Sequence, residues 1–151
     1  MSREILFKAK TTKKDNPKHE FSEKWVEGNL ILCGEKAYIH PISNKIRTTG
    51  EIGRIIVLHE VIHNTLCQYT GLTDKNGKRI WENDVVKCNK RKEGYDLYKV
   101  VWRKEFADFG VEPLMYKAQY PIGFTLGRTL RGYDYKVIGN IFDNADLLEV
   151  E

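Results

Sequence analysis

The segment His59-Glu60-Val61-Ile62-His63 has the HExxH spacing of zinc metalloproteases. On a helix, the four-residue spacing brings two imidazoles within reach of one zinc ion. On a strand the same two histidines lie roughly 13 Å apart, at about 3.3 Å per residue, and cannot share an ion. The chemistry open to this motif therefore depends on the secondary structure that the surrounding residues adopt.

The residues around the motif favour a strand, because the run Ile55–Ile62 is dominated by β-branched side chains. A helix is the alternative, since apolar residues near the motif also recur at helical spacing. Glu82 or Cys67 would then have to supply the third ligand. We expect no metal site, no catalytic residue and no enzymatic activity. A zinc hydrolase built on the two histidines and the intervening glutamate is the last of three functional hypotheses.

Asp74, Asn76 and Gly77 resemble the beginning of a calcium loop, in which side-chain oxygens bind the ion from alternate positions. The further acidic position and the bidentate glutamate of such a loop are missing. Asn76-Gly77 is also the strongest short hairpin signal, because a two-residue type I′ turn needs φ > 0 at both central residues. We therefore interpret these residues as a hairpin turn and expect no cofactor.

Positive charge is concentrated between residues 87 and 104, where seven basic residues stand against Glu93 and Asp96. Such residues could neutralise phosphates while an aromatic face stacks a base, so weakly specific nucleic-acid binding is the second hypothesis. Its predicted site consists of Lys87, Lys90, Arg91, Lys92, Tyr98, Lys99 and Arg103. The plainer interpretation is a solvated basic hairpin, in which strand aromatics such as Tyr98 are core residues or cross-strand pairs.

The elements that must position these residues are mostly short strands. The predicted strands are Ile5–Ala9, Trp25–Cys33, Lys36–Ile42, Val85–Asn89, Tyr98–Trp102 and Tyr135–Ile141. We expect the first to lie at a sheet edge, the second and third to pair across Gly34-Glu35, and the fourth and fifth to pair across the basic turn. Asn144 is expected to cap a short helix over Ala145–Glu149, because its side chain can accept from the amides that follow.

The stretch Cys67–Lys87 joins a strand end, a glycine turn, the Asn-Gly hairpin and the start of another strand. Its aromatic and β-branched run, Gln68-Tyr69-Thr70, ends at Gly71, which is free to take positive φ. After the hairpin, Glu82-Asn83-Asp84 leads into a valine-rich strand. A short turn feeding such a strand is a frequent opening of small SH3-like barrels.

This stretch resembles the signature of the YopX family of small phage and prophage proteins. The resemblance extends to Arg3–Ala9, Lys24–Leu30 and Tyr135–Glu149, and so covers nearly the whole chain. Asn83 stands where the family usually has glycine, and Cys67 where glycine often precedes the glutamine. The signature residues, which we interpret as structural, are Gln68, Tyr69, Thr70, Gly71, Asp74, Asn76, Gly77, Asp84, Gly139 and Asn140.

The composition, with 41% hydrophobic and 30% charged residues, is that of an ordinary globular protein. Three scattered cysteines without a CxxC pair indicate reduced thiols rather than disulfides or a zinc ribbon. No apolar run approaches the ~20 residues of a membrane span, so we expect no membrane partner. The net charge is +4, yet the last eleven residues carry only acidic charges. This asymmetry suits nucleic-acid contact or head-to-tail association of copies.

We expect a mainly β, α+β protein that forms one YopX-like domain over residues 1–151. Within it we predict a mixed amino-terminal lobe, residues 1–62, and a small SH3-like barrel, residues 63–151. The resemblance implies a phage or prophage accessory protein that acts in the bacterial host cytoplasm by binding. A protein-interaction or self-assembly module is the first hypothesis. Its expected partners are further copies of the chain and a phage or host protein.

Overall fold

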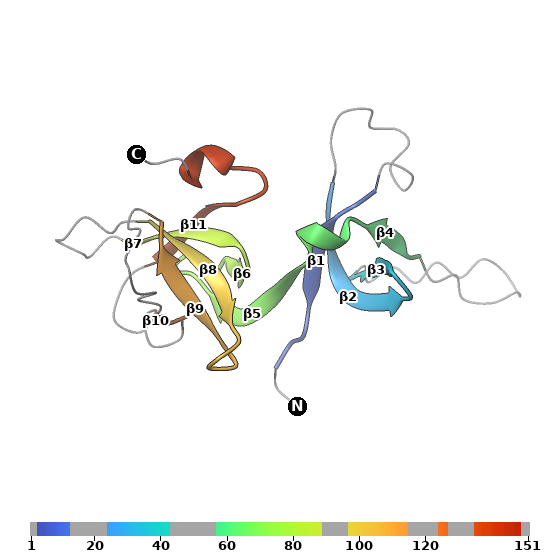
Figure 1. Ribbon diagram of the computed structural model, residues 1–151, viewed down its shortest axis with the longest axis horizontal. Coiled ribbons are helices and arrows are strands. Elements are labelled where there is room, and N and C mark those ends of the chain that lie inside the picture. Colours follow the sequence, from blue (N-terminus) through green and yellow to red (C-terminus); the bar gives the residue numbers. More distant parts are fainter. Residues whose placement is uncertain are drawn as a thin grey trace, which may run out of the picture. The chain divides into compact units, whose positions relative to one another are not determined.

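A computed structural model describes residues 3–12, 24–42, 57–88, 97–114, 124–126 and 135–148. The described chain consists mainly of antiparallel strands with two short 3-10 helices, which confirms the expected mainly β class (Figure 1). It divides into two compact units, Met1–Gln68 and Tyr69–Glu151. The lobe boundary predicted from the sequence, between residues 62 and 63, lies six residues before the boundary between these units. The predicted division into lobes remains a prediction.

In the first unit, strands β1 to β4 form a meander and β5 returns to pair with β1, which gives the order β4-β3-β2-β1-β5. A single bridge between Thr11 and Val61 also joins the end of the first strand to the fourth. The elements are β1 (Phe7–Lys10), β2 (Trp25–Cys33), β3 (Lys36–Pro41), β4 (His59–Val61), the 3-10 helix η1 (His63–Thr65) and β5 (Cys67–Thr73).

Alternation of side chains across the pleat explains the core of this unit, because residues two apart face the same side. The core contains Ala9, Ala37, Ile39 and Val61, with Phe7, Val26, Leu30 and Leu66 packed against it. The predicted pairing of β2 with β3 is confirmed, and its turn lies at Gly34-Glu35. Cys33, at the end of β2, is exposed, whereas Cys67 and Cys88 are buried.

The expected edge position of the first strand is wrong, because β1 pairs with β2 on one side and with β5 on the other. Two lysines of β1, Lys8 and Lys10, lie over the ring of Trp25 on the neighbouring strand. The ammonium groups of Lys8 and Lys10 are 4.9 and 5.7 Å from the ring centroid. Their charge therefore lies on the face of the sheet and leaves the backbone of β1 free to pair on both sides.

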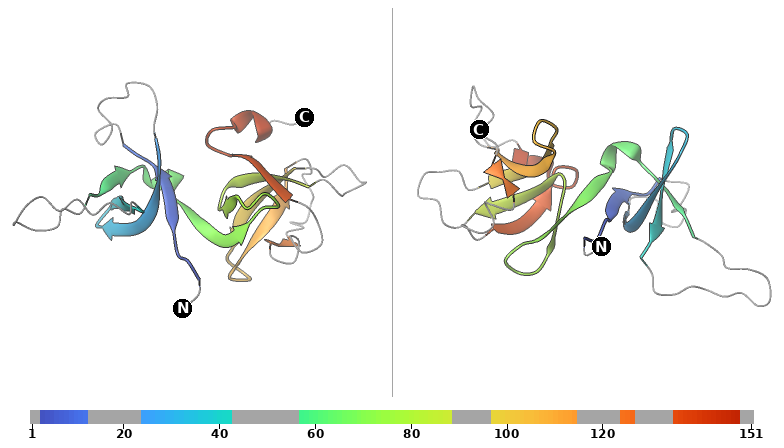
Figure 2. Two further views of the ribbon diagram at one scale, coloured as in Figure 1. Left: turned by 180° about the vertical axis from the view of Figure 1, so that it is seen from behind. Right: turned by 90° about the horizontal axis from the view of Figure 1, so that it is seen from below.

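The second unit contains an antiparallel five-stranded sheet in the order β10-β9-β8-β7-β11 (Figures 1 and 2). In the part of this unit that the structure describes, the edge strands β10 and β11 do not pair, so the sheet is open and the predicted SH3-like barrel is not confirmed. The elements are β6 (Arg79–Trp81), β7 (Asp84–Cys88), β8 (Leu97–Arg103), β9 (Asp108–Pro113), β10 (Phe124–Thr125), β11 (Tyr135–Asn140) and the 3-10 helix η2 (Ala145–Leu148).

One face of this sheet forms the core of the second unit. Its buried residues include Val86, Tyr98, Val100, Val111 and Val137, which come from four neighbouring strands. The predicted pairing of the β7 and β8 segments is confirmed. Strand β5 enters the unit from the first one, since Cys67 and Gln68 pair with β1 whereas Tyr69 and Thr73 pair with β6.

Gly28 gives a direct test of the pairing of β2 with β3. A Cβ atom added there would lie 1.9 Å from the backbone oxygen of His40, so the two strands would have to separate. We expect Gly28→Ala to lower the free energy of unfolding by about 1–3 kcal/mol, the usual cost of overpacking. The measurement is urea denaturation followed by circular dichroism.

The matched control is Gly34→Asn in the β2–β3 turn. Gly34 has φ of 60° and open space around it, and asparagine adopts this left-handed conformation more readily than other side chains. Its stability should stay close to that of the wild type. Equal stability of Gly28→Ala and the wild type would contradict the close approach of the two strands.

Candidate binding surfaces of the second unit

The carboxylate of Asp74 is the hub of the signature segment. It is 6% exposed, and its oxygens accept three backbone hydrogen bonds. Oδ1 accepts from the amides of Asn76 at 2.8 Å and Lys78 at 2.9 Å, and Oδ2 accepts from the amide of Val137 at 3.0 Å. Burial raises the pKa of this carboxyl, but these donors and the Lys78 charge outweigh burial and hold the pKa below its ordinary value. Asp74 thus ties the hairpin to β11.

The hairpin between β5 and β6 is not the predicted two-residue type I′ turn. Gly77 has positive φ, 78°, but Asn76 does not. The amide of Gly77 donates to the oxygen of Asp74 at 3.0 Å, and the amide of Asp74 donates to the oxygen of Lys78 at 2.8 Å. The loop therefore has three residues and ends in a left-handed glycine, a common hairpin form. The side chain of Asp74 stabilises it by binding the amide of Asn76.

Thr70 and Gly71 form a bulge in β5. Tyr69 pairs with Trp81 and Thr73 with Arg79, so the β5 side holds two more residues than the β6 side. The hydroxyl of Thr70 donates to the backbone oxygen of Ile80 at 2.7 Å and accepts from the amide of Leu72 at 3.2 Å. Gly71 has φ of 83°, as expected. The threonine side chain thus replaces ladder hydrogen bonds where the bulge interrupts them.

A second turn of the signature leads into β7. Oδ2 of the buried Asp84 accepts from the amide of Trp81 at 2.8 Å. Asn83 has φ of 66°, a left-handed conformation that asparagine and glycine adopt more readily than other residues. The amide of Asn83 donates to the oxygen of Val100, and its own oxygen accepts from the amide of Ile141. This turn therefore connects to β8 and to the residue after β11.

The end of β11 is built around a close approach between Gly139 and Asn144. A Cβ atom at Gly139 would lie 2.2 Å from Oδ1 of Asn144. That oxygen accepts from the amide of Asn140 at 3.2 Å, so the expected side-chain cap of the following helix is wrong. Oδ1 of Asn140 accepts from the amides of Phe142 and Asp143 at 2.9 and 3.0 Å. Asn144 therefore fixes the turn after β11.

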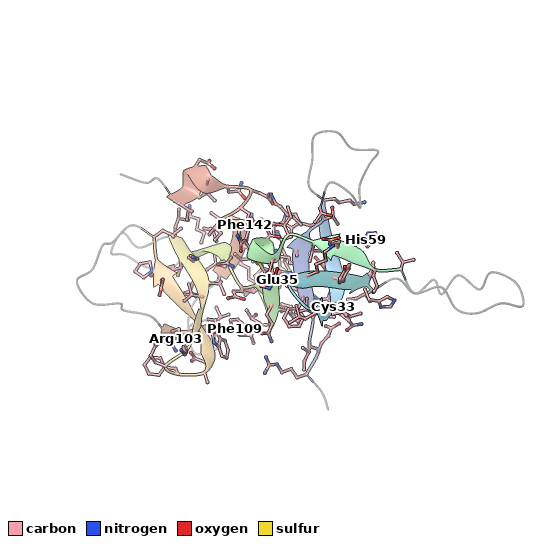
Figure 3. All side chains as sticks on the ribbon, turned by 45° about the vertical axis from the view of Figure 1, so that its right-hand side comes forward. Cys33, Glu35, His59, Arg103, Phe109 and Phe142 are labelled. Atoms are coloured by element: carbon pink, nitrogen blue, oxygen red, sulfur yellow. The ribbon has the colours of Figure 1, made fainter. Side chains whose placement is uncertain are left out.

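The HExxH residues do not form the helix that a shared zinc ion requires. His59, labelled in Figure 3, begins strand β4. His63 begins the 3-10 helix η1. Across the described ranges, no group of three histidine, cysteine, aspartate or glutamate side chains is placed to hold a metal ion. In the same ranges no helix is long and apolar enough to cross a membrane.

The predicted basic site is only partly described, because Lys90, Arg91 and Lys92 lie outside the described residues. Lys87 is exposed on β7, and Lys99 is half-buried on β8. The sequence prediction missed Lys136 of β11, which is exposed and lies directly opposite Lys87. We call Lys87, Lys99 and Lys136 the lysine face. Only the alternation of Tyr135, Lys136 and Val137 could have indicated that Lys136 faces outward.

Two other members of the predicted basic site have different roles. Tyr98 is 1% exposed and packs edge-on against Tyr135 in the core, with ring centroids 6.0 Å apart. Its predicted place on a nucleic-acid surface is therefore wrong, because the ring has no free face for a base. Arg103 makes a bidentate ion pair with Asp108, with Nε–Oδ1 of 2.8 Å and Nη2–Oδ2 of 2.6 Å. The fork of this guanidinium is thus already filled.

The end of β8 and the turn that follows present two large aromatic side chains, Trp102 and Phe106, which we call the aromatic tip. They are 46% and 69% exposed. The ring of Trp102 packs edge-on against Phe109 at 5.0 Å, and the guanidinium of Arg103 lies 4.6 Å from the centroid of Phe106. Arg103 and Phe109 lie together at this end of the hairpin (Figure 3). Both rings of the aromatic tip therefore contact a neighbouring side chain and remain partly exposed to solvent.

The chain matches one family model and is similar in fold to a solved structure. The family model described as YopX protein matches residues 12–149. The crystal structure of protein EF1440 from Enterococcus faecalis is similar, with a TM-score of 0.57 and 21% sequence identity. That similarity covers 98% of this chain and 100% of the other, and at this identity it shows the fold alone. No curated protein matches the chain.

The buried carboxylate of Asp74 predicts loss of stability in acid. Because its pKa is lower in the folded chain than in the unfolded chain, it stabilises the fold at neutral pH, and this contribution disappears as the pH falls through the folded pKa. Asp74→Asn should lower the free energy of unfolding at neutral pH by about 1–3 kcal/mol, because a buried donor loses its charged acceptor. It should also flatten the acid limb of the stability curve.

The measurement is the urea midpoint of unfolding across a pH series. Asp146→Asn is the matched control, because it removes a carboxylate from an exposed position in η2 and should keep wild-type stability at neutral pH. Parallel acid limbs for Asp74→Asn and the wild type would show that Asp74 is not the stabilising carboxylate.

Proposed function

The chain belongs to the YopX family, and on that premise we propose that it is a non-enzymatic binding module that associates with another protein through the aromatic tip. We propose further that it is a phage or prophage accessory protein of the bacterial host cytoplasm. The partner is a second copy of the chain or a phage or host protein. These biological assignments follow from what the family resemblance implies.

The observation that carries the proposal is the exposure of Trp102 and Phe106 at one end of a well-paired hairpin. Aromatic residues and arginine dominate the binding energy of protein interfaces, where they fill pockets on the partner. Single exposed apolar residues are common on any protein surface. Here two large exposed rings lie at the same end of one hairpin, and each packs against a neighbouring side chain. This arrangement favours a binding role more strongly than isolated exposed apolar residues do.

The base of the tip is rigid, which favours affinity because little side-chain freedom is lost on binding. Arg103 and Asp108 face each other in the β8–β9 ladder and are also joined by their bidentate ion pair. Ala107 has φ of 49°, a conformation that is costly for a residue other than glycine. Such strain often accompanies functional turns. The hairpin thus fixes the position from which Phe106 projects.

The non-enzymatic assignment is supported by the local structure at the HExxH motif. Its first histidine lies on β4 and its second on η1, so the residues lack the helical spacing on which the zinc hypothesis depends. The signature carboxylates, Asp74 and Asp84, bind backbone amides of their own turns. In the proposed binding module these two carboxylates therefore stabilise turns and have no catalytic role.

Phe106→Ser is the test of this proposal. The association of the purified protein is measured by sedimentation velocity over a concentration series, and its partners are captured from host lysate and identified by mass spectrometry. Loss of an interface anchor costs about 2 kcal/mol or more, so we expect the affinity for the partner to fall about 30-fold. Thermal unfolding should change little, because this ring is mostly exposed.

Leu32→Ser is the matched control, because Leu32 is a similarly exposed apolar residue, 62% exposed, in the first unit. It should retain the association of the wild type. A wild-type protein that stays monomeric and captures nothing specific would contradict the proposal, and so would equal association of both variants.

A further inference from the structure

The lysine face lies on the side of the five-stranded sheet opposite the core residues Val86 and Val137. Val85 lies on the same side as the lysines and is buried, so this side is exposed at Lys87 and Lys136 and partly covered near Lys99. Lys136 of β11 is directly opposite Lys87 of β7, and Val137 is opposite Val86 in the next register position. Because successive side chains alternate between faces, the two lysines lie on the face opposite the buried valines. The pairing of the sheet thus brings together two cations that are distant in the sequence.

Lys99 completes this face from the third strand. It pairs with Val85, which is two residues before Lys87 and therefore on the same side of the sheet. Lys99 is then a diagonal neighbour of Lys87, within reach of a long side chain. Strands β11, β7 and β8 each contribute one lysine, and neighbouring strands are about 4.8 Å apart. The three ammonium groups can therefore follow one extended anion.

Direct opposition of two lysines is unfavourable unless a counter-charge is present, because like charges opposite each other destabilise a strand pair. Among the residues that the structure describes, neither Lys87 nor Lys136 has an ion-pair partner. Glu112, on β9, is opposite Lys99 and two strands away from Lys87. The β11–β7 part of the face therefore carries excess positive charge on paired backbone, next to the register shift between Val137 and Gly139.

We propose that the lysine face binds the phosphate backbone of nucleic acid without reading its sequence. A polyanion with about one charge per 1.7 Å of duplex gains affinity by releasing its counterions to such a face. Two predicted residues are not placed to read bases, since Tyr98 is buried and the Arg103 fork is bound to Asp108. This activity goes beyond the proposed protein association and uses a different surface.

The dependence of affinity on salt measures how many lysines contact phosphates. Three contacts predict a slope of log K against log salt of about −3 for duplex DNA and about −2 for single strands. We would titrate fluorescently labelled single- and double-stranded DNA of mixed sequence with the purified full chain, and follow anisotropy from low to physiological salt.

The test variant is Lys87→Gln with Lys136→Gln. We expect its affinity at low salt to fall about tenfold or more, and its duplex slope to become shallower by about 1.8. Its urea midpoint should equal or exceed that of the wild type, because the two opposed charges are gone. A merely structural role for these lysines would lower the midpoint and leave the slope unchanged.

The matched control is Lys75→Gln with Lys104→Gln, which removes two exposed charges from turns of the same unit and should keep the wild-type slope. No DNA binding by the wild type at low salt overturns the proposal, as does an equal loss in the control. Equal binding of polyglutamate and DNA overturns it in favour of an acidic protein partner. Phe106→Ser should bind DNA as the wild type does. Failure of the DNA-binding proposal would therefore not contradict protein association through the aromatic tip.

Discussion

The hydrogen bond from the amide of Val137 to the carboxylate of Asp74 is the constraint on which the second unit depends. It joins the signature hairpin to β11 across 63 positions of sequence. A carboxylate that accepts several backbone amides is strongly held, because a charged acceptor strengthens each bond. Since Lys136 precedes Val137 directly, the same contact also fixes the strand on which Lys136 meets Lys87.

Strand β8 shows how one element can serve a core and two surfaces. Tyr98 and Val100 lie in the core. Trp102 follows on the same side of the strand but is partly exposed to solvent. Lys99 and Arg103 lie on the other side, and Arg103 forms an ion pair with Asp108. The alternation with period two therefore places Trp102 and Lys99 on opposite sides of one strand without any additional element.

Local features of this fold could be predicted from the sequence, whereas contacts between distant segments could not. The β2–β3 hairpin follows from residue type and alternation, and its predicted turn was confirmed. The Asn76-Gly77 turn was assigned to the wrong type because the deciding bond comes from the side chain of Asp74. Tyr98 was placed on the surface because its basic neighbours dominated the pattern, while its packing against Tyr135 depends on a strand much later in the chain.

The distribution of thiols has a practical consequence for following this protein in solution. All three cysteines are free, but Cys67 and Cys88 are buried and only Cys33 is exposed, next to the β2–β3 turn. A maleimide dye added to the native protein should therefore attach at one position in the first unit. The natural sequence thus supplies a site-specific spectroscopic label far along the chain from both proposed surfaces, and no engineered cysteine is required.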